Sequence, residues 1–272
     1  MNNYKRKNYI VLAENFVNKD KEKAIEFYEK ALSYDGDEEQ TLILLSNIAI
    51  IYDELGRLHE SVETYKRIIE INHLNYDAYY NIATLYDEIG NKEKALEYFY
   101  KVVEVDPKNY ITYNNIGSLY EEAEDYDLAL LMIQKSLEIN PNYYKSLFNM
   151  GVVYKRLGNH KMAIEFYNRA KMQNSKYYYI YLNLSAIYIE EGRYKKSIEI
   201  LTEGIENNPD ARDLYYNRAC SNSILKYEDN AIMDIREALV LDPEIIYWIS
   251  RDKDFENLYN NIEFKKILDS IK

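Results

Sequence analysis

The sequence predicts an all-α fold made of antiparallel helix pairs that recur every 34 residues. Three residue types with different backbone roles share this period and its phase. Spacings of 34 or 68 residues separate Pro107, Pro141, Pro209 and Pro243; Gly56, Gly90, Gly158 and Gly192; and Tyr52, Tyr86, Tyr120, Tyr154 and Tyr188. Agreement among three residue types in one register indicates a repeated supersecondary unit.

Each repeat is expected to hold two amphipathic helices. In the unit that begins at Tyr76, apolar residues follow the helical i, i+3, i+4 spacing twice. The first helix carries Tyr79, Ile82, Ala83 and Tyr86, and the second carries Ala95, Phe99, Val102 and Val103. Gly90 suits the turn between them because glycine adopts positive φ without strain, and Pro107 ends the second helix.

A small residue at the eighth position of each unit predicts that the two helices pack closely. The residues at this position are Ala49, Ala83, Gly117, Gly151, Ser185 and Ala219. Helices whose backbones approach closely need a small side chain at the contact, and the large residue three positions later fills the space beside it.

The spacing of these residues resembles the signature of the tetratricopeptide repeat. It is carried in one unit by Ala83, Tyr86, Gly90, Ala95, Phe99 and Pro107. The resemblance extends roughly from Lys5 to Pro243, which is most of the chain. It implies a right-handed superhelical solenoid whose concave face is lined by the first helix of each repeat.

The repeat register divides the chain into one continuous solenoid domain. We expect a divergent N-terminal repeat over 1–41, repeats over 42–75, 76–109, 110–143, 144–177, 178–211 and 212–243, and C-terminal capping helices over 244–272. Three departures are expected to weaken the pattern: a longer loop at Asp37–Gln40, Glu124 in place of the turn glycine, and Asn222 with Lys226 in the last repeat. If position 124 keeps a positive φ, the residue there costs about 1–2 kcal/mol.

The tail after Pro243 has apolar spacings suited to two or three short helices, with Asp252 or Asp254 as a cap. One interpretation is a cap over the last helix pair, because an array must cover its terminal apolar face. The other is a segment that folds into the groove and blocks it.

Composition limits the kind of partner. The net charge of −12 disfavours nucleic acid, and we expect the only basic cluster, Lys5, Arg6 and Lys7, to be a solvated end. The single cysteine, Cys220, fits a reducing compartment, and the longest apolar runs are too short to span a membrane. The cytoplasm is therefore the expected location.

The sequence contains no recognisable catalytic or cofactor motif. The three histidines, His59, His73 and His160, form no metal-ligand pair, and no glycine-rich phosphate loop occurs. We therefore expect neither an enzyme nor a bound cofactor, and an enzyme or metal protein is only the third hypothesis.

Asparagine occupies the sixth position of every one of the six complete repeats. These residues are Asn47, Asn81, Asn115, Asn149, Asn183 and Asn217. The position points away from the close helix contact, and a carboxamide can pair with the N–H and C=O of an extended peptide. The pattern resembles the asparagine ladder of the O-GlcNAc transferase superhelix. The alternative is that asparagine is simply tolerated on this face.

Charged and aromatic residues flank this ladder. Positions twelve and thirteen are acidic at Asp53, Asp87 and Glu121 and their neighbours, then switch to basic at Lys155, so a basic or mixed-charge peptide would be steered there. The alternative is that helix ends are merely solvated. At position five, Tyr80, Phe148 and Tyr216 are either anchors for a partner's side chains or packing residues between repeats.

These observations favour a protein–protein interaction module that binds an extended peptide or a helix of a partner in its concave groove. The alternative is a structural scaffold that associates with itself through outer-face tyrosines or end repeats. The sequence does not fix the oligomeric state.

Overall fold

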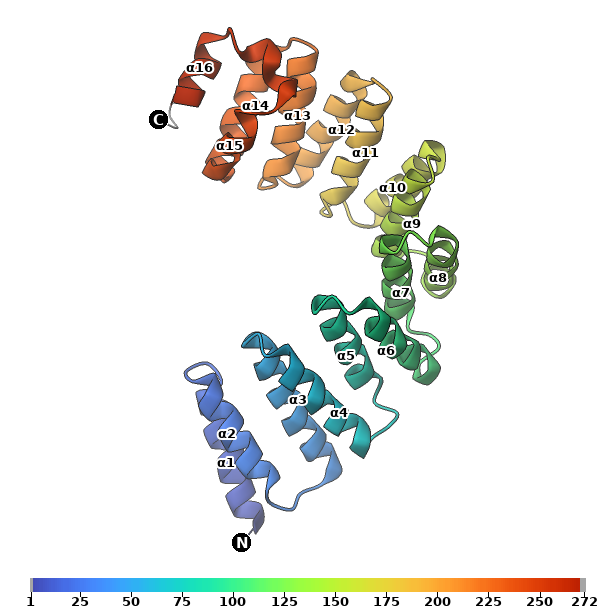
Figure 1. Cartoon of the computed structure of the whole chain (residues 1–272), viewed down its shortest axis with the longest axis vertical. Helices are drawn as coiled ribbons and strands as arrows, with labels where there is room; N and C mark the ends of the chain where they lie inside the picture. The colour runs from blue at the N-terminus through green and yellow to red at the C-terminus, as the bar shows by residue number, and fades with distance from the viewer. Residues whose placement is uncertain (1, 270–272) are drawn as a thin grey trace. The chain divides into compact units, whose positions relative to one another are not determined.

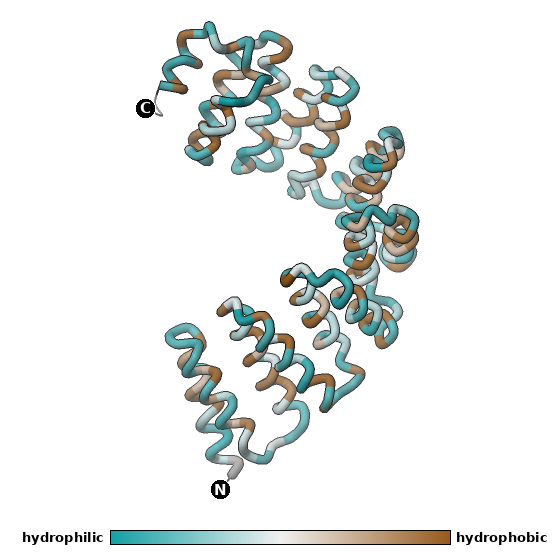
Figure 2. Tube along the Cα trace, in the orientation of Figure 1, coloured by the Kyte–Doolittle hydropathy of each residue, from teal (hydrophilic) through white to brown (hydrophobic). Residues whose placement is uncertain are grey.

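The structure is a computed structural model that describes residues 2–269 as helices and connecting turns, with no strand among them. The chain divides into two compact units, Met1–Asp125 and Tyr126–Lys272. Apolar residues recur along the helices in short stretches separated by polar ones (Figure 2), as amphipathic helices require.

Unit 1 contains seven helices in its described part. They are α1 (Asn2–Phe16), α2 (Lys21–Leu32), α3 (Glu38–Glu54), α4 (Leu58–Ile71), α5 (Tyr76–Glu88), α6 (Lys92–Val105) and α7 (Tyr110–Glu122). Helices α1 and α2, α3 and α4, and α5 and α6 form pairs, and each pair packs on the next helix in the chain (Figure 1). Ala24, Tyr28 and Ile48 are buried between the first two pairs.

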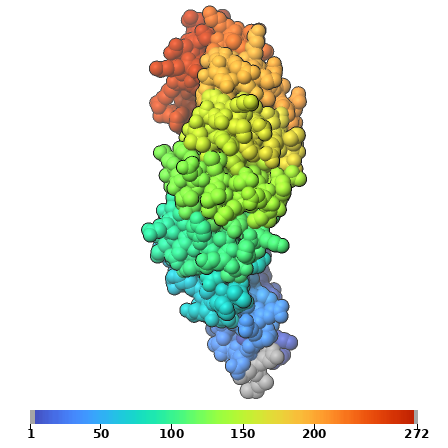
Figure 3. Space-filling view, turned by 90° about the vertical axis from the view of Figure 1, so that its right-hand side faces the viewer, coloured from blue at the N-terminus to red at the C-terminus, as the bar shows by residue number. Residues whose placement is uncertain are grey.

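Unit 2 continues with α8 (Tyr126–Ile139), α9 (Tyr144–Arg156), α10 (His160–Gln173), α11 (Tyr179–Glu190), α12 (Tyr194–Asn207), α13 (Arg212–Ile224) and α14 (Glu228–Leu241). Short elements follow: η1 (Pro243–Ile245), α15 (Ile246–Ile249), η2 (Lys253–Leu258) and α16 (Ile262–Asp269). The pairs α9–α10, α11–α12 and α13–α14 follow one another as bands in chain order (Figure 3). The predicted all-α fold of antiparallel helix pairs is thus confirmed within each unit.

Local sequence explains where the helices begin and how closely they pack. Asn75, Asn91 and Asn109 cap α5, α6 and α7 by accepting a hydrogen bond from a backbone N–H three residues on. A Cβ added at Gly151 would lie 2.6 Å from the ring of Tyr167, so α9 and α10 approach too closely for a larger residue.

The first repeat differs from its expected form in two places. Asp37 caps α3, which begins at Glu38, so the predicted loop Asp37–Gln40 is mainly the first turn of a longer helix. Arg6 is only 2% exposed, and the prediction of a solvated end is wrong for this residue. Its guanidinium donates to Gln40, to the carbonyl of Tyr34 and to Thr41, because the longer α3 brings these acceptors to it.

The tail after α14 is a cap, as the first interpretation expected. Phe255, Leu258 and Phe264 are fully buried against α13 and α14, in one core cluster with Ala219 and Ile235. Asp252 caps η2 by accepting a hydrogen bond from the backbone N–H of Asp254, at 2.9 Å. The repeat boundaries, and the continuity of the array from one unit to the next, stay predictions.

In the part of the chain that the structure describes, two turns between consecutive helices have a non-glycine residue at positive φ. Glu124 has φ 60° and Lys226 has φ 61°, whereas the turn glycines Gly56, Gly90 and Gly158 have φ between 70° and 83°. We expect Glu124→Gly and Lys226→Gly each to raise the free energy of unfolding by about 1 kcal/mol, because strain is removed. Urea denaturation measures this, and an unchanged midpoint in both variants would contradict it.

Candidate functional site

The six ladder asparagines lie on the first helix of successive pairs and are all half-buried. In unit 1 they are Asn47 on α3, Asn81 on α5 and Asn115 on α7; in unit 2 they are Asn149 on α9, Asn183 on α11 and Asn217 on α13. Because the register is kept, each unit carries three equivalent carboxamides, one on each of three first helices.

Part of the hydrogen-bonding capacity of these carboxamides is used inside the protein. Asn81 and Asn217 donate from Nδ2 to the backbone carbonyl four residues earlier, at 2.8 and 2.7 Å. Asn183 makes the same bond at 2.9 Å and also accepts from the hydroxyl of Tyr167. These bonds hold the side chains against their own helices and orient them.

Two asparagines of unit 1 bond to tyrosines of the preceding repeat. Nδ2 of Asn115 donates to the hydroxyl of Tyr80 at 3.1 Å, and Nδ2 of Asn47 lies 3.4 Å from the hydroxyl of Tyr28. The bond from Asn115 links positions six and five of consecutive first helices. The ladder therefore also contributes to the packing of one repeat on the next.

The three predicted aromatic residues at position five have different surroundings. Tyr80 packs edge-on against Phe99, with ring centroids 5.7 Å apart. Phe148 contacts the rings of Tyr167 and Tyr177, with centroids 5.5 and 5.1 Å away. Both aromatic residues remain half-exposed on their first helices.

Tyr216 is covered by the tail. Its hydroxyl donates a hydrogen bond to Asp252, and its ring packs edge-on against Phe255 at 5.8 Å. Burial, together with the Asp252 carboxylate, raises the pKa of Tyr216. The tail thus contacts position five of the last repeat through Asp252 and Phe255.

A cluster of tyrosines beside Phe148 was not predicted from the sequence. Tyr177 contacts the rings of Tyr144, Phe148 and Tyr179, with centroids 5.1 to 5.3 Å apart, and Tyr178 stacks on Tyr179 at 4.3 Å. The run of three tyrosines that leads into α11, Tyr177 to Tyr179, was the available signal. Because tyrosine is abundant throughout the chain, that signal was not distinctive.

The acidic residues of unit 1 lie near the ends of its first helices. Asp53 and Asp87 are exposed, and Glu121 is half-buried. Desolvation of the Asp87 carboxylate by surrounding atoms, and then the neighbouring Glu122 carboxylate, raise the pKa of Asp87, although Lys92 opposes this. Lys92 pairs with Glu122, so basic residues of the second helices already neutralise part of this surface.

The basic position of unit 2 is balanced by the following repeat. Lys155 on α9 lies 3.3 Å from Glu190 on α11, and His160 also approaches Glu190 and Glu191, at 3.4 and 3.5 Å. The Glu190 carboxylate therefore offsets the positive charge that was predicted at Lys155.

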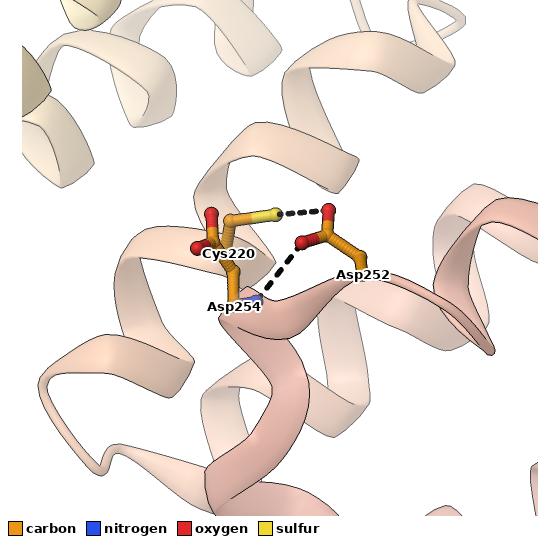
Figure 4. A group of neighbouring side chains, drawn as sticks. All are labelled: Cys220, Asp252 and Asp254. Carbon is orange, nitrogen blue, oxygen red and sulfur yellow. Dashed lines mark hydrogen bonds between the residues drawn. The ribbon is translucent and has the colours of Figure 1, made fainter.

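One group of side chains has the composition of a metal site. The ligand atoms of Cys220, Asp252 and Asp254 lie within 4.8 Å of one another, at the contact between α13 and the tail (Figure 4). The Cys220 thiol donates to Asp252 at 3.8 Å, and burial raises the pKa of this thiol. Because the thiol is neutral and donates to a carboxylate, the three side chains can be explained as part of the packing of the tail on α13.

A buried ion pair lies between α13 and α14. Arg218, 15% exposed, donates two hydrogen bonds to Asp234, which is 2% exposed, at 2.7 and 3.0 Å. Asn222 also donates to Asp234, and Thr202 accepts from Arg218. Burial raises the pKa of Asp234 because desolvation of its carboxylate outweighs the attraction of Arg218.

Asn222 departs visibly from the repeat pattern, but the other members of this network were not predicted from the sequence. The equivalents of Arg218 in the other repeats are apolar: Ile48, Ile82, Ile116, Met150 and Leu184. A charged residue at a position that is apolar elsewhere, together with a carboxylate on the facing helix, would have been the signal.

None of the helices among residues 2–269 has the length and apolar character needed to cross a membrane. An array of helix pairs that presents equivalent side chains on each first helix is a protein-interaction scaffold. Models of the tetratricopeptide repeat match residues 76–109, 110–171, 18–38, 44–72, 178–211 and 213–245. The chain belongs to the tetratricopeptide repeat family and is therefore a protein–protein interaction module, of a family that is generally not catalytic.

Solved structures share this fold at low sequence identity. A tetratricopeptide repeat protein from Parabacteroides merdae is 20% identical, with a TM-score of 0.68 over 98% of each chain. YrrB, described as having an unusual peptide-binding site, is 22% identical, with a TM-score of 0.51 over 70% of this chain and 97% of its own. PilF of Pseudomonas aeruginosa is 13% identical, with a TM-score of 0.64 over 81% of this chain and 97% of its own. No curated protein matches the chain in sequence.

Proposed function

We propose that the chain binds an extended segment of a partner protein along the surface of its first helices. The single observation that carries this proposal is the row of half-buried asparagines at one register on these helices. Asn81 and Asn217 each use one amide N–H on their own helix, which leaves the side-chain oxygen and the second N–H for a peptide backbone.

The aromatic residues beside the row would supply anchoring for side chains of the bound segment. Tyr80 in unit 1 and Phe148 with Tyr177 in unit 2 are half-exposed aromatic groups, and large apolar groups in such positions dominate binding energy. We do not assign this role to Tyr216, because its hydroxyl donates to Asp252 and its ring packs on Phe255 of the tail. We therefore place the anchoring residues on α5 in unit 1, and on α9 and the turn before α11 in unit 2.

We also propose that unit 1 prefers a basic segment. Asp53 and Asp87 carry exposed carboxylates on α3 and α5, and a basic peptide would be attracted to them. In unit 2 the pairing of Lys155 with Glu190 makes the charge mixed. The cytoplasmic location stays a prediction from the single cysteine.

Removing two ladder carboxamides tests the proposal. The variant Asn81→Ala with Asn217→Ala should weaken binding of a partner captured from the native cell by about 1 kcal/mol per lost hydrogen bond. Isothermal titration calorimetry with the purified partner measures the change. These two asparagines are chosen because their side chains bond only to their own helices among the described residues.

Asn207→Ala is the matched control. Asn207 makes the same bond, from Nδ2 to the carbonyl four residues earlier at 2.9 Å, but lies on α12, the second helix of its pair. We expect its substitution to leave the affinity unchanged. Equal affinities for all three proteins would exclude the first-helix surface as the binding site.

A further inference from the structure

The outer face of the second helices carries a regular pair of carboxylates. Two exposed positions, seven residues apart, are glutamate at eight of ten places in the five repeats before the last. The first position reads Glu63, Glu97, Leu131, Glu165 and Glu199, and the second reads Glu70, Glu104, Glu138, Met172 and Glu206. A residue seven positions on lies on the same side of a helix, so these pairs face solvent together.

Helix α14 alone among these second helices has an apolar residue at both positions. They are Met233, which is 55% exposed, and Val240, which is 78% exposed. The repeat fold does not require apolar residues there, since the equivalent glutamates are compatible with it. Met233 and Val240 therefore form an apolar stripe on the outer face that distinguishes α14 from the other second helices.

A hollow of about 320 Å³ lies beside this stripe, between α14 and the start of α16. Ile232 and Met233 provide its apolar lining, and Asp229, Glu237 and Glu263 contribute carboxylates to it. A second hollow of about 180 Å³, on the α12 side of α14, is also lined by Met233. Met233 thus forms a ridge between two depressions, and its flexible thioether suits an adaptable contact.

The charges around the stripe favour a basic occupant. Arg236, the one basic side chain lining the larger hollow, is paired with Glu263. Asp229 and Glu237 have no ion-pair partner among the described residues. The rim is therefore negative overall, and a cationic partner would be attracted to it.

The same charges disfavour a second copy of this chain as the occupant. A symmetric dimer would place the stripe and its acidic rim against themselves, which brings like charges together. The chain as a whole has a net charge of −12, which adds to this repulsion.

We propose that the outer face of α14 and the hollow beside α16 bind a basic amphipathic helix of a partner protein. The partner's apolar side contacts Met233 and Val240, and its flanking lysines or arginines pair with Asp229 and Glu237. This surface lies on a second helix and is distinct from the first-helix surface proposed above.

A synthetic helix tests this surface directly. The probe is a labelled peptide of about 15 residues with leucines at i, i+4 and i+7 and lysines beside them. Its control has glutamates in place of the lysines. Fluorescence anisotropy with the full chain should show binding of the basic peptide and none of the acidic one. Failure of the basic peptide to bind, or equal binding of both peptides, would overturn the proposal.

Substitutions that copy the other repeats locate the binding. Met233→Glu with Val240→Glu should weaken binding of the basic peptide at least about tenfold, and it should fold normally because glutamate is the usual residue at these positions. Leu131→Glu with Met172→Glu makes the same change at equivalent positions of α8 and α10 and should leave binding unchanged. Equal binding by the two variants would overturn the proposal.

Two further measurements separate this proposal from its alternatives. The Asn81→Ala, Asn217→Ala variant should bind the basic peptide like the wild type, and loss of binding in it would place the peptide on the first-helix surface instead. Sedimentation velocity should show a monomer. A dimer that Met233→Glu with Val240→Glu abolishes would assign the stripe to a second copy and overturn the proposal.

Discussion

Replacing Asp234 with alanine is expected to lower the free energy of unfolding by about 3–5 kcal/mol. The substitution leaves the guanidinium of Arg218 buried without its carboxylate, and Asn222 loses an acceptor. The cost is large because a charge that is kept from water needs a partner. Urea denaturation followed by circular dichroism measures it.

Removing the whole network should have a very different result. The triple variant Arg218→Leu, Asn222→Tyr and Asp234→Ile restores the residues of the preceding repeat, which are Leu184, Tyr188 and Ile200. Replacement of a buried ion pair by well-packed apolar groups is often neutral or stabilising by about 1–4 kcal/mol. If the triple variant were as unstable as Asp234→Ala, the unpaired charge of Arg218 would not explain the loss of stability in Asp234→Ala.

Replacing Phe255 with alanine is expected to lower the free energy of unfolding by about 3–5 kcal/mol. The ring is fully buried, contacts Tyr216 and Phe264 with centroids 5.8 and 6.1 Å away, and covers the apolar end of the last helix pair. Without it, the surface of Ala219 and Ile235 would be left beside a cavity.

Tyr259→Ala is the control for the cap. Tyr259 lies in the same segment and stacks on Phe264 with centroids 6.0 Å apart, but it is 40% exposed, so its loss should cost only about 1 kcal/mol. Hydrogen exchange should show that Phe255→Ala loosens α13 and α14 first. A Phe255→Ala protein as stable as the control would show that the tail does not stabilise the last repeat.

The helix pairs could be predicted from the sequence because the same physical requirement repeats. Each turn needs positive φ, so glycine recurs every 34 residues at positions equivalent to Gly90. Each close contact needs a small side chain, so small residues recur with the same period at positions equivalent to Gly151. The departure from glycine at Glu124 could also be interpreted, because this residue keeps the positive φ of the turn, at 60°. Because the unit recurs, the residue at each position can be compared with its equivalents in five other repeats.

Contacts that occur once could not be predicted in this way. The burial of Arg6 depends on acceptors brought by α3, and the covering of Tyr216 depends on where the tail turns back. Neither contact has an equivalent in another repeat. The ladder asparagines illustrate a third case: their register was evident, but their bonds to their own helices and to Tyr80 depend on side-chain rotamers.

Site-specific photo-crosslinking tests most directly whether a partner lies on the first helices. A photo-reactive residue at Thr84 is on α5, three residues after Asn81, and one at Glu97 is on the outer face of α6 in the same repeat. We expect a partner from the native cell to crosslink through position 84 and not through position 97. Crosslinking through position 97 alone would contradict it.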